Sequence, residues 1–277
     1  MKFLMCGDVV GRSGRDVAKK YIKQYRKEVD FIVVNVDNAA HGFGVTPSIA
    51  NDFFEIGADV LTGGNHVVDQ KEIFPMLSSD KRLLKPANTS DKLPGRGIGE
   101  YTLRNGRKVV IVHLLGQKDM PMIGDNPFVF MEKFFLKYQL EVNVSAIIVD
   151  FHAEVSSEKL AMGHFLDGKV SVVFGTHIHI PTADYRILEN GTAYQTDLGM
   201  CGDYNSVLGF QKTVSIDRFL KGFGTGRLTP ATGEGTFSGL LVEVDDKTGL
   251  ATSIEHILKK YVNTQDINIL CKIFYKL

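Results

Sequence analysis

The chain has 277 residues, 44% of them apolar, and its 32 Lys and Arg residues balance its 32 Asp and Glu residues. This length can bury a core without disulfides or a structural metal, and the zero formal charge excludes a strongly basic protein, so long nucleic acid is not an expected partner. The cysteines lie far apart and no apolar run approaches the ~20 residues of a membrane-spanning helix, so we expect a soluble, cytoplasmic protein with no membrane partner.

Short apolar runs alternate with amphipathic stretches over the first two thirds of the chain. The apolar runs predict buried strands at Lys2–Gly7, Phe31–Val36, Asp59–Thr62, Lys108–Leu114, Ala146–Phe151 and Val170–Gly175. The amphipathic stretches predict helices at Gly14–Glu28, Thr46–Ile56, Asp69–Leu77 and Asn126–Leu140. This alternation indicates an α/β fold.

The last third of the chain is typical of antiparallel structure. It predicts strands at Tyr185–Leu188, Ala193–Leu198, Leu240–Val244 and Thr252–Leu258, with a turn in the segment DDKTG. No Pro-rich or Ser-rich linker divides the chain, so we expect these strands to join the same sheets rather than form a second domain. For the tail from Lys259 to Leu277, a short helix packed on the body or on a partner is the expectation.

Polar side chains follow successive predicted strands, at the point where each strand ends. They are Asp8, Asp37, Asn38, Asn65, His66, His152, His177 and His179. Each by itself is more typical of a turn, a helix cap or a structural hydrogen bond. Because the carboxyl ends of parallel strands meet at one crevice, the set as a whole predicts a site there.

Carboxylate, amide and imidazole donors together suit divalent Mn, Fe or Zn. No cysteine joins the set, which argues against a closed structural zinc site. So many donors suggest two ions bridged by a shared carboxylate. Phosphoester hydrolysis uses such a pair, because ions ~3.5–4 Å apart clamp phosphoryl oxygens and lower the pKa of a water between them, giving an activated hydroxide. A neighbouring His then acts as general acid.

The order of the motifs resembles a known family. A GD near the N-terminus, then GNH, an isolated His and GTHIH are similar to the calcineurin-like metallophosphoesterase superfamily. More closely, the chain resembles the bacterial YmdB-like cyclic-nucleotide phosphodiesterases in GDVVGRSGR, DNAAHGFGVT, GGNHVVDQKEIF, KPANTS, DFHAEVSSEKLAMGHFLDGKVSVVFGTHIHIPTAD and DLGMCG. The resemblance covers Met1 to about Leu258.

This resemblance implies a two-sheet α/β metallophosphoesterase sandwich flanked by helices, forming one domain over residues 1–258, with 259–277 as an extension of unknown role. It implies two divalent metal ions, with Fe or Mn favoured and Zn or Mg as alternatives. The first ion would be bound by Asp8, Asp37, Asn38 and His179. The second would be bound by Asp37, Asn65, His152 and His177. Asp37 would bridge the ions, and His66 would be the general acid.

The chain departs from the family pattern at two places. Val9 and Val10 stand where the wider superfamily usually has a His, and the amide of Asn38 compensates in the closer family. Asp37 stands where the closer family usually has Glu, one methylene longer. His41 and Asp69 lie inside matched motifs and are expected to orient ligands or close the pocket.

The leading hypothesis is a metal-dependent phosphodiesterase (a hydrolase) that acts on small nucleotide-like diesters, such as 2′,3′- or 3′,5′-cyclic nucleotides. One alternative is a phosphomonoesterase with the same ions, for which Arg12, Arg15 and Arg186 are candidate phosphate contacts. Another is a non-catalytic nucleotide-binding regulator, favoured by the shorter Asp37. A dinucleotide-binding oxidoreductase is excluded because the glycines are spaced GxxxGxxG rather than GxGxxG. The resemblance is compatible with a homo-oligomer.

Overall fold

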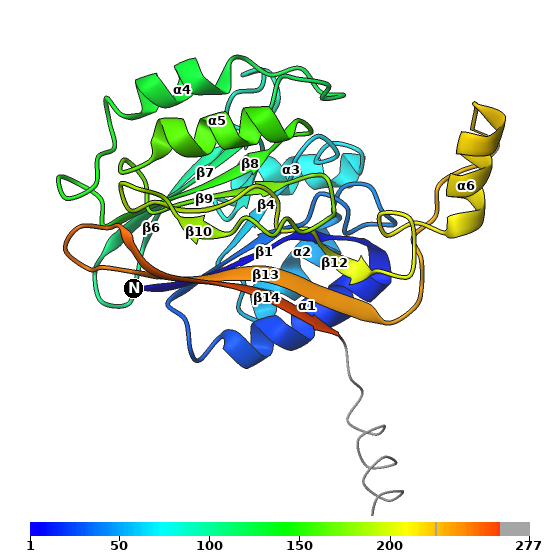
Figure 1. The fold of residues 1–277 in the computed structure, drawn as a ribbon, viewed down its shortest axis with the longest axis horizontal. Coiled ribbons are helices and arrows are strands. Elements are labelled where there is room, and N and C mark those ends of the chain that lie inside the picture. Colours follow the sequence, from blue (N-terminus) through cyan, green and yellow to red (C-terminus); the bar gives the residue numbers. More distant parts are fainter. Residues whose placement is uncertain (225, 261–277) are drawn as a thin grey trace, which may run out of the picture.

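The computed structural model describes residues 1–224 and 226–260. Two β-sheets pack face to face, with helices on both outer sides (Figure 1). The first sheet has the order β2-β12-β13-β1-β3-β4-β5, with β14 paired to β13. The second has the order β10-β11-β9-β8-β7-β6. The predicted two-sheet α/β sandwich is confirmed.

The strands of the first sheet are β1 Lys2–Cys6, β2 Asp8–Val9, β3 Phe31–Asn35, β4 Val60–Thr62, β5 Leu83–Leu84, β12 Met200–Asp203, β13 Gly235–Val244 and β14 Ala251–Lys260. Those of the second sheet are β6 Ile98–Thr102, β7 Lys108–Leu115, β8 Ala146–His152, β9 Val172–Thr176, β10 Arg186–Ile187 and β11 Ala193–Gln195. The helices are α1 Gly11–Tyr25, α2 Pro47–Glu55, the 3₁₀ helix η1 Lys71–Ile73, α3 Phe74–Ser79, α4 Pro127–Phe134, α5 Ser156–Leu166 and α6 Lys212–Lys221.

Three apolar layers hold the sheets and helices together. In β1, Leu4 packs into the layer under α1, α2 and α3, whereas Phe3 and Met5 pack into the layer between the sheets. A third layer lies between the second sheet and helices α4 and α5. Since alternate side chains of a strand point to opposite faces, a strand covered on both sides must be apolar throughout. This explains the continuous apolar runs in the sequence.

Strands β1, β3, β4 and β5 run parallel to one another, as do β7, β8, β9 and β11. Strand β13 runs antiparallel between β1 and β12 and carries β14 on its hairpin. The predicted antiparallel strands of the last third therefore join the two sheets, β13 and β14 in the first sheet and β10 and β11 in the second. No helix in the described part of the chain is long and apolar enough to cross a bilayer.

Two helix predictions were wrong in length. The helix predicted over Asn126–Leu140 ends at Phe134, because Leu136 and Lys137 bond to carbonyls three residues back instead of four, which tightens the turn. The predicted helix at Asp69–Leu77 is a 3₁₀ turn followed by α3, with Pro75 in the first turn of α3. Helices α5 and α6 and the strands β2, β5, β6 and β12 were not predicted. The expected helix in the tail lies outside the described residues, apart from Lys259 and Lys260, which extend β14.

Candidate active site

The eight predicted site residues come from five strand ends, three in the first sheet and two in the second. Asp8 follows β1, the pair Asp37 and Asn38 follows β3, and Asn65 with His66 follows β4. His152 is the last residue of β8, and the loop after β9 carries His177 and His179. This loop edge lies on the side of the molecule from which α6 projects in Figure 1.

Hydrogen bonds and short contacts join these residues into one cluster. The carboxylate of Asp37 accepts from the backbone N–H of His66 at 3.0 Å and lies 3.3 Å from Nε2 of His152. The same Nε2 lies 3.0 Å from Oδ1 of Asn65 and 3.1 Å from Nδ1 of His177. Asp8 accepts from the backbone N–H of His177 at 3.0 Å. A sixth contact pairs Nε2 of His179 with Oδ1 of Asn38 at 3.2 Å. The prediction that the strand ends converge is confirmed.

The loop that carries the last two histidines has an unusual backbone. His177 and His179 have positive φ angles of 103° and 63°, a region that costs energy for residues other than glycine. The strained turn directs both imidazoles toward the cluster. Close packing accompanies it, because a Cβ at Gly64 would lie 2.3 Å from the ring of His152 and one at Gly175 would lie 1.8 Å from the Thr196 carbonyl oxygen.

Burial shapes the charges of the cluster. Burial, followed by the nearby carboxylate of Asp197, raises the pKa of Asp8 well above its usual value. Burial also opposes ionisation of Asp37, but the imidazoles of His152, His66 and His177 together outweigh this effect and lower the pKa. Burial and the neighbouring His152 lower the pKa of His177 to about 2, and burial lowers that of His179. Neutral imidazoles are the form that binds metal ions.

A buried network beneath the cluster was missed by the sequence analysis. Asp150, fully buried in β8, accepts hydrogen bonds from the hydroxyls of Thr62 at 2.6 Å and Thr176 at 2.7 Å and from the amide of Asn35 at 3.1 Å. The Thr176 hydroxyl donates its one hydrogen to Asp150. Its oxygen must therefore accept from Nδ1–H of His152, 2.9 Å away. This tautomer leaves a lone pair on Nε2, which is the atom that faces the cluster.

A second missed element supports the strained loop. The ammonium of Lys159, buried on α5, donates to Asp197 at 2.6 Å and to the carbonyl of Thr176 at 2.8 Å. Asp197 also accepts from the backbone N–H of Ile178 at 3.3 Å, between the two histidines. Both residues lie in motifs quoted above, Lys159 in DFHAEVSSEKLAMGHFLDG and Asp197 in DLGMCG. Neither was singled out, because a lysine side chain is rarely buried.

The remaining histidines and their neighbours divide into several roles. Nδ1 of His66 pairs with Asp69 at 2.8 Å, as expected for a residue that orients it, whereas His41 is exposed. His113 is fully buried, with Nδ1 3.2 Å from Asp150. Glu154, which was not predicted, lies 3.0 Å from Nε2 of His177.

The chemistry of the cluster fits divalent ions. Oδ1 of Asp8 is buried without a hydrogen-bond partner, and several electron-pair donors surround Nε2 of His152. Within residues 1–224 and 226–260, no group of three or more His, Cys, Asp or Glu side chains is placed to hold a metal ion. Binding would therefore require a rearrangement of these side chains together with the amides of Asn38 and Asn65. The donor types match the expectation of Fe, Mn or Zn.

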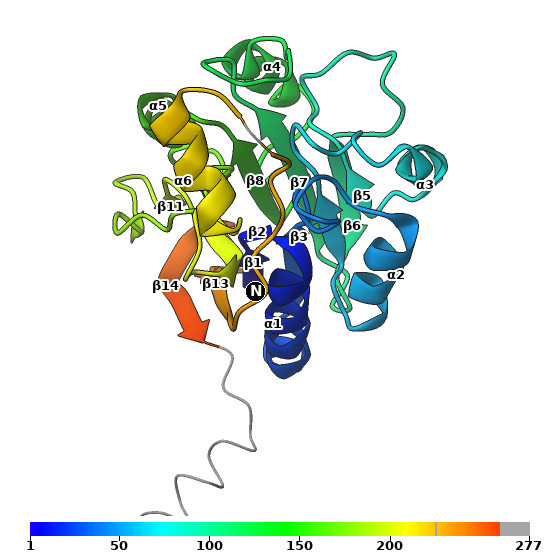
Figure 2. The same ribbon diagram turned by 90° about the vertical axis from the view of Figure 1, so that its right-hand side faces the viewer.

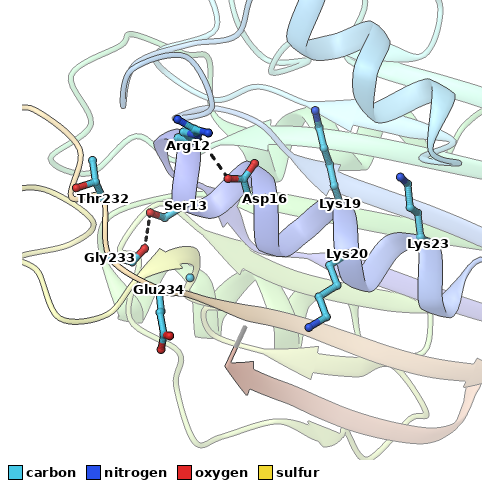
Figure 3. A pocket seen from close by; sticks show the side chains of 10 residues that line it. Arg12, Ser13, Asp16, Lys19, Lys20, Lys23, Thr232, Gly233 and Glu234 are labelled. Atoms are coloured by element: carbon cyan, nitrogen blue, oxygen red, sulfur yellow. Dashed lines mark hydrogen bonds and ion pairs between the residues drawn. The ribbon is translucent and has the colours of Figure 1, made fainter. Parts of the chain in front are cut away.

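A larger hollow of about 790 Å³ lies away from this cluster, along α1 and the loop at Thr232–Gly235 (Figure 3). Its cations do not converge, because Arg12 lies 3.6 Å from Asp16 and Lys19 pairs with Asp52 outside the hollow. The lysines of α1 therefore form no phosphate site here. Of the three arginines considered as phosphate contacts, none lines the cavity beside the cluster, whereas Arg218 does.

The chain as a whole is similar to several known proteins. The YmdB-like protein family matches residues 4–257. A 2′,3′-cyclic-nucleotide 2′-phosphodiesterase of Bacillus subtilis (strain 168) is 41% identical over 260 residues, which cover 93% of this chain and 97% of that protein. A putative phosphatase/phosphodiesterase of Mycoplasma pneumoniae is 34% identical, covering 97% and 93%. The crystal structure of a novel phosphatase from Mycoplasma pneumoniae superposes with a TM-score of 0.87 at 32% identity, covering 97% and 96%.

Proposed function

The chain belongs to the YmdB-like protein family, and on this premise we propose that it is a metal-dependent phosphodiesterase that hydrolyses 2′,3′- or 3′,5′-cyclic nucleotides and related small diesters. The observation that carries the proposal is the convergence of two carboxylates, two amides and four imidazoles at one edge of both sheets. The name of the Bacillus subtilis relative supports the substrate class.

Two divalent ions would be held by the residues that the sequence assigned to them. Asp8, Asp37, Asn38 and His179 would bind one ion, and Asp37, Asn65, His152 and His177 the other. The ions would supply Lewis acidity toward the phosphoryl group and hydroxide at neutral pH. Fe and Mn are the ions that we favour, because imidazole and carboxylate donors suit both.

His66 is the proton donor in this proposal. Its backbone N–H is bonded to the Asp37 carboxylate, which fixes the residue beside the ion-binding cluster. Its Nδ1 faces Asp69, so Nε2 is the atom left to face a substrate. The side chain is 27% exposed and lines the cavity, which gives it access to a leaving oxygen. A His in this position transfers a proton to the departing alkoxide.

The first experiment removes His66. His66→Ala should lower turnover of bis-p-nitrophenyl phosphate about 10²- to 10⁴-fold while metal content stays unchanged, because His66 is not a metal ligand in this scheme. The matched control is His164→Ala, an exposed histidine on α5 that does not line the cavity, which should keep its turnover. Equal turnover in the His66→Ala variant and the parent would remove His66 from the mechanism.

The second experiment ranks substrates and metals. Metal-stripped protein receives Mn²⁺, Fe²⁺, Zn²⁺ or Mg²⁺ separately and is assayed on bis-p-nitrophenyl phosphate and on the monoester p-nitrophenyl phosphate. Metal-restored cleavage that is faster on the diester supports the proposal. Faster cleavage of the monoester would favour the phosphomonoesterase alternative. No hydrolysis of either substrate with any of the metals would favour the non-catalytic regulator.

A further inference from the structure

The cluster opens into a cavity of about 320 Å³ with two chemically different ends. One end is formed by the polar side chains of Asn38, His66, His177 and His179. The other end is apolar and is lined by Phe43, Val207, Phe210, Phe219 and Leu228. Leu208 lies next to the polar end, where its carbonyl accepts from Nδ1–H of His179 at 2.9 Å. A phosphate group needs only the polar end, so the apolar end must serve some other part of the ligand.

The apolar end begins at the proposed proton donor. The ring of Phe43 meets the ring of His66 edge-on, with centroids 5.0 Å apart. On its other side it lies 5.4 Å from the ring of Phe210, tilted by 31°. Phe210 is only 8% exposed, and a Cβ at Gly42 would meet its ring at 2.6 Å. Phe43 and Phe210 thus form an aromatic wall of the cavity, and this wall begins in contact with the ring of His66.

Helix α6 forms the outer side of the cavity. It stands away from the body of the molecule in Figure 1, lies in front of the sheets in Figure 2, and contributes Arg218 and Phe219 to the cavity. Phe219 is 82% exposed, so most of its ring is free to contact a ligand in the cavity. Among the described residues, the guanidinium of Arg218 has no carboxylate partner. The carboxylate next to it in sequence, Asp217, pairs with Lys221.

We infer that this apolar end is a nucleoside-binding subsite, in which the base lies among Phe43, Phe210 and Phe219 while Arg218 closes over its face or edge. The inference rests on the proposed function and extends it. It names the residues that favour a phosphodiester of a nucleoside over a phosphodiester without sugar or base. Flat aromatic rings stack well on phenylalanine, and a guanidinium adds an attraction to a π-face. The subsite should accept any of the bases, because every base presents a π-face that can stack.

The occupant is a base rather than a second copy of the chain. The wall is continuous with the polar cluster, and its inner members Phe43 and Phe210 are half-buried and buried. A protein partner would meet the outward residues Phe219, Leu220 and Phe223 and would leave this inner wall uncovered. The volume is at the lower end of the range for small-ligand pockets, which suits a mononucleotide.

The test compares two substrates that share a reacting group. One is 2′,3′-cyclic AMP, and the other is ethylene phosphate, which has the same five-membered cyclic diester without sugar or base. Phe219→Ala should lower kcat/KM for 2′,3′-cyclic AMP about 10-fold, mainly through KM, because base–aromatic stacking is lost. Its rate on ethylene phosphate should not change. Arg218→Ala should behave in the same way.

The matched control is Phe223→Ala. Phe223 is 64% exposed, follows α6 closely and does not line the cavity. It should leave both rates unchanged. A parallel fall on both substrates, or no fall on either, would overturn the subsite. So would a change of oligomeric state in Phe219→Ala, measured by light scattering, without a change in the ratio of the two rates.

A binding measurement separates this inference from the proposed function. Calorimetry on the metal-loaded protein compares adenosine 3′-monophosphate, the product expected from cleavage of the 2′ ester, with inorganic phosphate. The subsite predicts tighter binding of the nucleotide and loss of that advantage in Phe219→Ala, whether or not the protein turns over. Cleavage of neither substrate together with this binding pattern would refute the phosphodiesterase and retain the subsite. Equal affinity for both ligands would refute the subsite itself.

Discussion

At the residue scale, the orientation of His152 depends on a hydroxyl that touches no substrate. Thr176 donates to Asp150 and accepts from Nδ1–H of His152, and this fixes which ring nitrogen faces the cluster. Groups that orient metal-binding histidines commonly change metal affinity 10- to 100-fold when they are removed. Thr176 is therefore a positioning residue that acts through His152.

Thr176→Val removes the hydroxyl with little change of shape and should weaken Mn²⁺ binding about 10- to 100-fold. Thr176→Ser keeps the hydroxyl and should bind the ion as the parent does. The affinities can be measured by calorimetry on metal-stripped protein, with circular dichroism to verify the fold. If the Val and Ser variants bound Mn²⁺ equally, the orienting role of Thr176 would be wrong.

Lys159 is a second buried residue that supports the site without being part of it. Its ammonium is the counter-ion of the fully buried Asp197 and also bonds to the carbonyl of Thr176. When one member of a buried ion pair is removed, the other is left as an uncompensated buried charge.

Lys159→Met should lower the free energy of unfolding by about 3–5 kcal/mol, as measured in urea. The variant should also lose metal affinity, because Asp197 bonds to the loop of His177 and His179 through Ile178. Lys133→Met, at an exposed position on α4, provides the control and should stay within about 0.5 kcal/mol of the parent. A stable Lys159→Met protein would show that Asp197 is neutralised by other means.

At the element scale, Asp184 ties the segment before β10 to the end of β11. Its carboxylate accepts from the hydroxyl of Thr196 at 2.6 Å and from the backbone N–H of the same residue at 3.2 Å. Burial opposes ionisation of Asp184, but the hydrogen bonds from Thr182 and Thr196 outweigh it and lower the pKa. A lowered pKa in the folded state means that ionised Asp184 stabilises the protein above its unfolded pKa of about 3.9.

Asp184→Asn should therefore cost about 1 kcal/mol at pH 7, a modest value because the carboxylate is partly exposed. The difference between variant and parent should shrink as the pH falls below about 4 and through the lowered pKa of the folded state. Urea unfolding at a series of pH values from 7 to 3 measures it. A difference that stays constant over this range would contradict the assigned role.

The elements also show what the sequence could predict and what it could not. The donors at the strand ends could be identified because an apolar run followed by Asp, Asn or His marks the end of a buried strand. Lys159 could not be identified, since a lysine in a helical pattern usually lies on the surface. Helix α6 and its aromatic residues gave no signal either, because Phe219 is exposed and its role depends on neighbours far away in sequence.

At the scale of the whole molecule, the cluster links the two sheets. Asp8, Asp37 and Asn65 belong to the first sheet, and His152 and His177 belong to the second. Beneath them, Asn35 and Thr62 bond across to Asp150. An ion bound here would hold the two sheets together, since its ligands come from both.

Metal removal should therefore lower the thermal midpoint of unfolding. An ion that binds the folded chain alone adds about 2.7 kcal/mol at a concentration 100 times its dissociation constant. Differential scanning calorimetry with and without a chelator measures the shift, which should increase with Mn²⁺ concentration. His152→Ala should abolish the dependence on Mn²⁺, and a full shift in that variant would place the ion elsewhere.

The position of β1 has a consequence for the synthesis of the protein. Strand β1 pairs with β3 on one side and with β13 on the other, so its second neighbour is residues 235–244. While the ribosome is still making the middle of the chain, β1 offers an unpaired apolar edge to any strand nearby. The nascent chain reaches its closed form only after nearly all of the described residues have emerged, and until then that edge is a site where a chaperone would bind.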